Sequence, residues 1–340
     1  MSGDQTVGSG FNEAGSYNHA LLWTATGVVD LNPTNLGVSY SIASATEGNQ
    51  QVGYGVGTGN NYHALLWTGT SASVVDLNPT NLGFVSSLAY GTNDSQQVGC
   101  GATSGNPNNP VALLWNGTAA SAVNLNPTNL SGFTESGAYA TNGTQQVGYA
   151  YGPGKEDAML WNGTAASAVD LNPTKLGITN SFAYGTSGTQ QVGAGWGYNE
   201  FTGESFGGAM LWTGTAASAV DLNPTNLSGI DDSEALATNG TQQVGFGYND
   251  YNVWGGSCAL LWSGTAASVV DLQTLLPSTG TWTSSSADLI DSSGNVYGWA
   301  SGTFDNVTGT FAVEWSVPEP ATASMLLIAG AGILMRRRRR

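Results

Sequence analysis

Short apolar segments of four to six residues recur along the chain, and clusters of Gly, Asn, Ser and Thr separate them. Four types repeat: Ala-Leu-Leu-Trp, Gln-Val-Gly, Val-Val-Asp-Leu-Asn-Pro and Ala-x-Ala-Thr-Asn, each with close variants. Apolar runs of this length between turn-forming residues predict β-strands rather than helices. The tryptophans that end the first type lie 44 to 53 residues apart, at Trp23, Trp67, Trp115, Trp161, Trp212 and Trp262, with a weaker copy at Trp315.

The residues between these segments predict tight turns. Asn116-Gly117 and Asn142-Gly143 supply the positive φ that hairpins need. The recurrent Asn-Pro favours an extended residue followed by a turn, which closes each unit of about 46 residues. Four strands per unit at this spacing are typical of a β-propeller blade, because a single small sheet cannot bury both of its faces without stacking on a neighbour.

We therefore predict an all-β fold in which residues 1–316 form a β-propeller of about seven four-stranded blades. Two segment types occur seven times and two occur six times. Six blades with leftover strands is the second interpretation, and an open β-solenoid is the third. The repeated Leu-Leu-Trp residues are expected in the core rather than at a ligand.

Charge narrows the classes of function. Only 9% of the 340 residues are charged and the net charge is −16, although the last five residues are all arginine. The rest of the chain holds two basic residues, Lys155 and Lys175. Such an acidic surface repels phosphate and excludes a nucleic-acid-binding protein. The low content of charged residues also argues against a coiled coil or helical bundle.

The composition changes after Trp315. Val317, Pro318, Glu319 and Pro320 precede an uncharged run over residues 321–335. As a helix this run would be about 22 Å long, short of the ~30 Å hydrocarbon core unless flanking arginines extend it. We predict one C-terminal hydrophobic helix within a second region, residues 317–340; a buried C-terminal helix is the alternative. The positive-inside rule puts the basic cluster in the cytoplasm and residues 1–316 outside; that membrane-stop cluster is Arg336, Arg337, Arg338, Arg339 and Arg340.

This order of Val-Pro-Glu-Pro motif, apolar helix and basic cluster resembles the PEP-CTERM sorting tail. The same segment is also catalogued as the ice-binding protein C-terminal domain, a label that carries no evidence of ice binding. The resemblance implies that an exosortase-type membrane transpeptidase cuts near Pro318, Glu319 and Pro320. The chain would hold a transient inner-membrane anchor and then pass to the cell surface or biofilm matrix of a Gram-negative bacterium.

The repeats resemble the HAF extracellular repeat family, whose units read roughly His-Ala-Phe-Leu-Trp, Asp-Leu, Ala-x-x-Ile-Asn and Gln-Val-Val-Gly. Residues 19–23 and 63–67 fit best; Leu replaces Phe, and later units lack the histidine. This resemblance implies an extracellular location. The first ten residues, however, have neither the basic nor the apolar region of a signal peptide. We therefore expect a start codon placed downstream of the true one, which an in-frame stop directly upstream would contradict.

Candidate metal ligands are sparse. His19 and His63 occupy equivalent positions of two units, so a zinc site would need help from other residue types. The carboxylate of Val-Val-Asp-Leu-Asn-Pro offers too few converging oxygens for calcium, which favours a turn-forming role. The densest acidic cluster, Asp231, Asp232 and Glu234, reads as a weak cation site or a solvated loop. The sequence predicts no cofactor and no metal, with Ca²⁺ as the less favoured alternative.

The segments after Gln-Val-Gly in the fifth and sixth units differ from the others because they are rich in aromatic residues. Aromatic rings with neighbouring carboxylates suit stacking on sugars, and aromatics at this density are typical of interfaces. A packed lid without a ligand is the alternative. The candidate ligand-binding residues are Trp196, Tyr198, Phe201, Tyr248, Tyr251 and Trp254.

These observations predict an exported surface or matrix propeller that binds extracellular polysaccharide or a matrix protein. No catalytic motif occurs in a supporting context, so the sequence predicts that the chain is not an enzyme. A polysaccharide-active propeller enzyme and a purely structural matrix protein are the alternatives.

Overall fold

The computed structural model describes residues 5–12, 17–57, 60–103, 109–199, 204–248 and 256–316, and these form an all-β structure. The chain divides into two compact units, residues 1–170 and 171–340. Each unit is a succession of small antiparallel sheets in which strands adjacent in the chain pair with each other.

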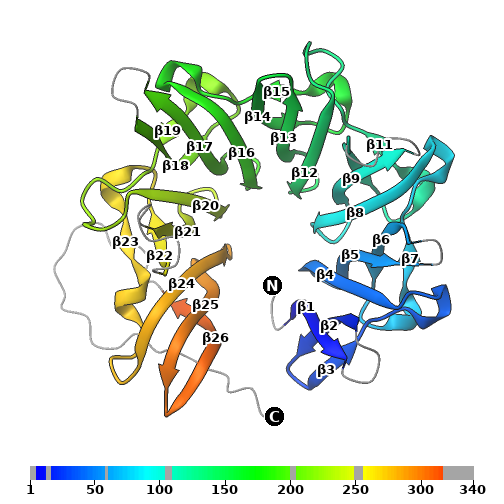
Figure 1. The fold of residues 1–340 in the computed structure, drawn as a ribbon, viewed down its shortest axis with the longest axis horizontal. Coiled ribbons are helices and arrows are strands. Elements are labelled where there is room, and N and C mark those ends of the chain that lie inside the picture. Colours follow the sequence, from blue (N-terminus) through cyan, green and yellow to red (C-terminus); the bar gives the residue numbers. More distant parts are fainter. Residues whose placement is uncertain are drawn as a thin grey trace. The chain divides into compact units, whose positions relative to one another are not determined.

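Unit 1 holds four such sheets. Its strands are β1 (Thr6–Asn12), β2 (Tyr17–Thr24) and β3 (Gly27–Asp30); β4 (Tyr40–Glu47), β5 (Gln50–Val56), β6 (Tyr62–Trp67) and β7 (Val75–Asp76); β8 (Phe84–Thr92), β9 (Gln97–Thr103), β10 (Val111–Trp115) and β11 (Val123–Asn124); and β12 (Glu135–Thr141), β13 (Gln146–Gly152), β14 (Lys155–Trp161) and β15 (Val169–Asp170). The first strand β8 contacts the first strands β4 and β12 of the neighbouring sheets, whereas the short strands β7 and β11 form the opposite edges of their sheets (Figure 1).

Unit 2 holds three sheets built in the same way. Its strands are β16 (Ile178–Thr186), β17 (Gln191–Asn199), β18 (Glu204–Trp212) and β19 (Val220–Asp221); β20 (Asp232–Thr238), β21 (Gln243–Tyr248), β22 (Cys258–Trp262) and β23 (Val270–Asp271); and β24 (Thr281–Ile290), β25 (Asn295–Phe304) and β26 (Val307–Ser316). The first strands β16, β20 and β24 contact one another in turn.

Short 3₁₀ helices connect the strands in both units. They are η1 (Thr34–Leu36), η2 (Ser71–Ser73), η3 (Thr80–Leu82), η4 (Ala119–Ser121), η5 (Ala165–Ser167), η6 (Thr174–Leu176), η7 (Ala216–Ser218), η9 (Ala266–Ser268) and η10 (Leu272–Leu275).

The prediction of about seven four-stranded blades followed by a helix is wrong. Five repeats form four-stranded groups, and the first and last repeats form three-stranded sheets, β1–β3 and β24–β26. The tryptophan segment marks a repeat but does not report how many strands surround it, so counting tryptophans overestimated the complete blades. The described part of the chain contains no α-helix; the helix expected over residues 321–335 lies outside the described residues.

The second strand of each four-stranded group requires glycine after its Gln-Val pair. Gly53 of β5 lies opposite Ala43 of β4, beside a register shift in that strand. A Cβ at Gly53 would lie 2.0 Å from the carbonyl oxygen of Ile42, so no larger residue fits without moving the strand. The recurrence of Gln-Val-Gly thus follows from a close approach of two backbones.

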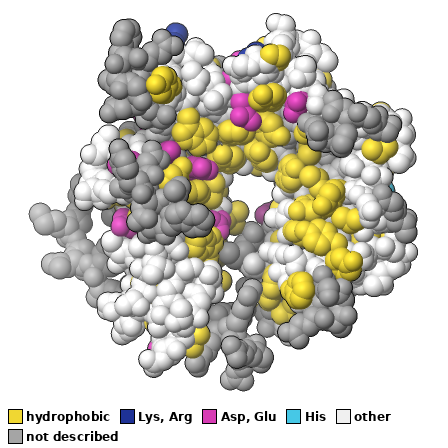
Figure 2. All heavy atoms as spheres, viewed as in Figure 1, with side chains coloured by type: hydrophobic (Ala, Val, Ile, Leu, Met, Phe, Trp, Pro, Cys, Tyr) yellow, Lys and Arg dark blue, Asp and Glu magenta, His cyan; other side chains and the backbone are white. Residues whose placement is uncertain are grey.

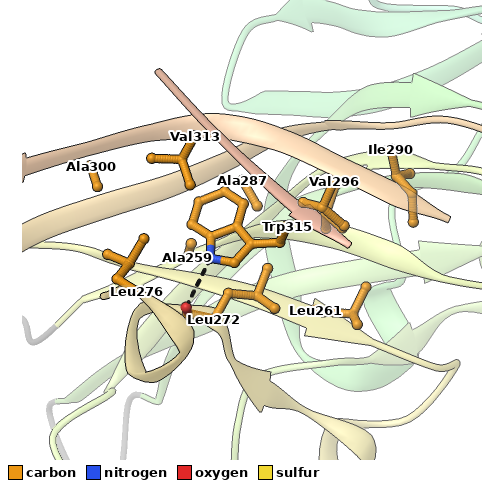
Figure 3. Packing of buried hydrophobic residues seen from close by; sticks show 11 residues of the cluster. Ala259, Leu261, Leu272, Leu276, Ala287, Ile290, Val296, Ala300, Val313 and Trp315 are labelled. Carbon is orange, nitrogen blue, oxygen red and sulfur yellow. Dashed lines mark hydrogen bonds between the residues drawn. The ribbon is translucent and has the colours of Figure 1, made fainter. Parts of the chain in front are cut away.

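The core lies between adjacent sheets, and the repeated tryptophans are at its centre. Trp67, Trp115, Trp161, Trp212 and Trp262 are each fully buried, which confirms their predicted core role. Figure 3 shows the last such cluster, in which Trp315 of β26 packs among Leu261, Leu272, Leu276, Ile290 and Val296. The Trp315 indole N–H donates to the carbonyl of Leu272 at 3.0 Å.

In the second strands β5, β9, β13 and β21, a buried glutamine links the sheet to the preceding sheet of the same unit. Gln97 is fully buried, and its Nε2 donates to Oε1 of Gln50 at 2.7 Å. The Oε1 of Gln97 accepts the backbone N–H of Gly117, also at 2.7 Å. The equivalent bonds join Gln51 to Gln5, Gln146 to Gln96 and, in unit 2, Gln243 to Gln190. The repeated Gln-Gln pair therefore couples consecutive sheets within each unit.

Candidate functional site

The face of unit 2 formed by β16, β17, β20 and β21 combines aromatic rings with carboxylates. Strand alternation places the small residues Ser181, Ala183, Ser233 and Ala235 in the core and leaves their neighbours half-buried on the other side, apart from the more deeply buried Asp232. Figure 2 shows hydrophobic and acidic side chains together over these strands. We call this surface the aromatic–carboxylate face; its members are Phe182, Tyr184, Trp196, Asp232, Glu234, Phe246 and Tyr248.

Asp232 is the centre of the face. It begins β20, pairs across the sheet with Tyr248 and is 7% exposed. Its Oδ2 accepts the indole N–H of Trp196 at 3.1 Å and the hydroxyl of Tyr248 at 3.2 Å. Its Oδ1 accepts the backbone N–H of Ser233 at 2.8 Å. One carboxylate therefore holds two rings that come from different sheets.

Glu234 lies two residues further along β20, on the same side, and pairs across the sheet with Phe246. Burial raises the pKa of Glu234, and the charge of Asp232 adds to this shift. A hydrogen bond from the Tyr184 hydroxyl stabilises the carboxylate and opposes the rise of the pKa. Glu234 thus titrates at a higher pH than an ordinary glutamate.

The rings of the face contact one another in pairs. Phe182 meets Trp196 edge-on at a centroid distance of 5.9 Å, and stacks against Tyr184 at 6.1 Å. Phe246 and Tyr248 are stacked at 6.0 Å. Such contacts, together with the hydrogen bonds to Asp232, fix the orientation of the rings.

The sequence-predicted ligand-binding residues divide into three groups. Trp196 and Tyr248 are brought together through Asp232, although they lie in strands rather than in loops. Tyr198 lies further along β17 and is 56% exposed. Phe201, Tyr251 and Trp254 lie outside the described residues, as do Val317, Pro318, Glu319 and Pro320 and the arginines at positions 336–340.

Sequence reasoning missed the roles of Phe182, Tyr184 and Phe246 and misread the acidic cluster. Asp232 and Glu234 are not part of a solvated loop: they occupy the first half of β20. The available signal was the strand-like alternation of Asp-Ser-Glu-Ala-Leu-Ala, in which small residues mark the core side.

Unit 1 carries a second aromatic cluster that the sequence did not indicate. The ring of Tyr139 lies 5.8 Å from that of Tyr90 and 5.4 Å from that of Tyr149. The Tyr90 hydroxyl lies 3.3 Å from the Cys100 sulfur. Burial raises the pKa of all three tyrosines, that of Tyr149 to about 12. These hydroxyls therefore stay protonated, and the cluster is chiefly a packed one.

The recurrent aspartate of Val-Val-Asp-Leu-Asn-Pro forms a turn, as predicted. Oδ1 of Asp76 accepts the backbone N–H of Asn78 at 2.8 Å, and its Oδ2 bonds to Nδ1 of His63, also at 2.8 Å. This bond raises the pKa of His63. The same pair recurs as His19 and Asp30. The described ranges contain no group of three or more His, Cys, Asp or Glu able to hold a metal ion.

In the fourth repeat an aspartate replaces that histidine. Asp157 is 4% exposed and hydrogen-bonds with Asp170, while Nζ of Lys155 lies 3.9 Å from its Oδ2. Burial and the charge of Asp170 raise the pKa of Asp157 to about 6, and Lys155 opposes the rise. The repeat therefore tolerates either a histidine–carboxylate or a carboxyl–carboxylate pair at this position.

Within the part of the chain that the structure describes, no helix has the length and apolar character needed to cross a membrane.

No family model matches this chain, and no curated protein sequence matches it. Solved structures do. A puromycin hydrolase (S511A mutant, complexed with PGG) is 13% identical with a TM-score of 0.55, over 92% of this chain and 50% of that one. The β-propeller domain of the Trilobed protease from Pyrococcus furiosus is 8% identical with a TM-score of 0.54, over 92% of each chain. An acylaminoacyl peptidase from Pyrococcus horikoshii is 9% identical with a TM-score of 0.53, over 93% of this chain and 50% of that one.

These similarities establish the fold as a β-propeller and correct one prediction. The chain spans about half the length of the puromycin hydrolase and of the acylaminoacyl peptidase that it matches. Propellers of this kind are thus found in peptidase chains. The prediction that the chain is not an enzyme is therefore overturned, because a propeller without a recognisable catalytic motif does not exclude enzymatic activity.

Proposed function

We propose that this chain is an exported propeller of the cell surface or extracellular matrix, and that its aromatic–carboxylate face binds polysaccharide. The observation that carries the binding role is the pair of hydrogen bonds from Trp196 and Tyr248 to Asp232. Rings held rigidly beside hydrogen-bond acceptors suit the stacking of pyranose rings, because little side-chain entropy is lost when the sugar binds.

The proposal that the chain is exported rests on its amino-acid sequence. The Val-Pro-Glu-Pro motif at residues 317–320, the apolar run at residues 321–335 and the terminal arginines are the parts of a PEP-CTERM tail. An exosortase-type protease would process this tail after the helix has anchored the chain transiently in the inner membrane. The resemblance of the repeats to HAF extracellular repeats supports the same address.

Retention on purified matrix polysaccharide tests the binding role. Trp196→Ala and Tyr198→Ala are expected to reduce retention at least tenfold, because they remove ring surface from the face and from its exposed border. Tyr17→Ala is a matched control, since Tyr17 is 52% exposed and lies in unit 1. Equal retention of all three variants and of the unchanged protein would contradict the proposal.

Mass spectrometry of the C-terminal end of the protein tests whether the chain is exported and processed. The full reading frame would be expressed in a host that has an exosortase and in the same host without it. We expect an extracellular product that lacks residues 321–340 only when the exosortase is present. An intact intracellular product in both hosts would overturn the address.

A second candidate function is that of a polysaccharide-active enzyme. Asp232 and Glu234 lie two residues apart on one side of β20, and the pKa of Glu234 is raised, as in sites that use one carboxylic acid and one carboxylate. Release of reducing ends from matrix polysaccharide, lost in Glu234→Gln, would establish it. Binding without any release of reducing ends would exclude it.

A further inference from the structure

The hydroxyl and indole donors of the aromatic–carboxylate face are already engaged by its own acceptors. The indole N–H of Trp196 and the hydroxyl of Tyr248 donate to Asp232, and the hydroxyl of Tyr184 hydrogen-bonds to Glu234. Phe182 and Phe246 have no polar atoms in their side chains. A ligand therefore meets π-faces and carboxylate oxygens, with these donors committed to the protein.

The shortage of hydrogen-bond donors on this face determines which ligands it can bind. A neutral sugar hydroxyl both donates and accepts hydrogen bonds, and would find acceptors but few donors here. An ammonium group only donates, since it has three N–H bonds and no lone pair. It is also attracted to the negative faces of tryptophan, tyrosine and phenylalanine rings.

The charge around the face also favours a cationic ligand. Among the described residues of unit 2, Lys175 is the one basic side chain, and it lies in η6 rather than in the strands of the face. Asp232 and Glu234 are accompanied by Asp231 immediately before β20. An anionic polysaccharide would be repelled by these carboxylates, whereas a cationic one would be attracted.

We propose that the aromatic–carboxylate face recognises the protonated amine of an amino-sugar polymer, with the rings stacking on the pyranoses and Glu234 receiving the ammonium. This inference rests on the proposed polysaccharide-binding function and names its ligand class. Asp232 is a positioning residue, because its Oδ2 accepts the N–H and O–H groups that orient the two rings, while its Oδ1 accepts the backbone N–H of Ser233. Glu234, which is only half-buried, is the carboxylate that meets the ligand.

Calorimetry with four probes of equal length tests the inference: oligomers of glucosamine, of N-acetylglucosamine, of glucose and of lysine. We expect the glucosamine oligomer to bind at least tenfold more tightly than the acetylated one, since acetylation removes the charge and two donors. Glu234→Gln removes the charge but keeps the size of the side chain, and should abolish this preference. Asp305→Asn is the control, because it removes an exposed carboxylate of the same unit at a turn position that asparagine tolerates.

The outcomes separate this inference from the proposed function. Equal binding of the acetylated and free-amine oligomers, lost in Trp196→Ala, would overturn the ammonium inference and leave polysaccharide binding intact. Binding of the lysine oligomer alone would overturn the assignment to a sugar polymer. Loss of the preference in Asp305→Asn as well as in Glu234→Gln would show a general charge effect and would contradict a role for Glu234. Failure of every carbohydrate probe would overturn both proposals.

Discussion

The indole N–H of Trp196 in β17 donates to Oδ2 of Asp232 in β20 at 3.1 Å, and this bond joins two consecutive sheets of unit 2. The same oxygen accepts the hydroxyl of Tyr248. Because Asp232 is 7% exposed, water cannot readily replace either donor. The orientation of the two rings and the solvation of the carboxylate are therefore coupled.

Removing one donor at a time should reveal this coupling. Trp196→Phe and Tyr248→Phe each keep a ring and delete one hydrogen bond, and each should lower the free energy of unfolding by about 1–2 kcal/mol. The double variant should cost more than the sum, because Asp232 then loses the indole and the phenol donor together. Chemical denaturation of the four proteins measures the cycle, and strict additivity would argue against a shared acceptor.

The bridge from Gln97 to Gln50 predicts a second stability effect. Gln97→Leu leaves the N–H of Gly117 and the Oε1 of Gln50 without this partner, so we expect a loss of about 2–4 kcal/mol. Gln97→Glu is the matched variant: its carboxylate keeps an acceptor for Gly117 but cannot donate to Gln50, and because position 97 is fully buried the added charge should make it less stable than the leucine variant. Denaturation midpoints of the three proteins give the order, and a leucine variant as stable as the parent would show that the bridge contributes nothing.

The raised pKa of Asp157 predicts a pH dependence with a definite sign. The folded protein holds this proton up to about pH 6, whereas an unfolded aspartate releases it near 3.8, so the folded state binds more protons between these values. Stability should therefore fall as the pH rises through this window. Asp157→Asn should reduce this slope and raise the stability at pH 7 by about 1–2 kcal/mol.

Thermal unfolding of the parent and of Asp157→Asn at pH 4, 5, 6 and 7 measures this effect. Asp305→Asn, which alters an exposed carboxylate, serves as the control and should keep the slope of the parent. A parent that becomes more stable from pH 4 to 7, relative to Asp157→Asn, would contradict the assignment.

The core and the turns could be read from the sequence because they repeat. Trp67 and its equivalents end apolar strands of constant pattern, and Asp76 precedes Asn-Pro in a turn, so the local chemistry alone indicated their roles. The strand number of the first and last sheets was not encoded in this way, because the tryptophan segment forms whether its sheet has three or four strands.

The candidate site was found only in part for a different physical reason. Trp196 and Tyr248 stand out by their type, but the residue that joins them, Asp232, depends on contact between β17 and β20, and no local pattern reports such a contact. Gln97 was missed for the same reason: a buried amide appears polar in the sequence, and only its partners Gln50 and Gly117 explain its burial.

The repeated tryptophans allow a last prediction, because their indole N–H groups differ. The Trp161 indole nitrogen is buried and has no hydrogen-bond partner within the described ranges, whereas that of Trp315 donates to Leu272 at 3.0 Å. Trp161→Phe and Trp315→Phe delete the same volume from similar clusters. The second change also leaves a carbonyl without this donor, and should therefore cost about 1–2 kcal/mol more than the first. Comparison of the two unfolding free energies measures the difference, and an equal or larger loss for Trp161→Phe would mean that its indole N–H stabilises the protein as much as that of Trp315.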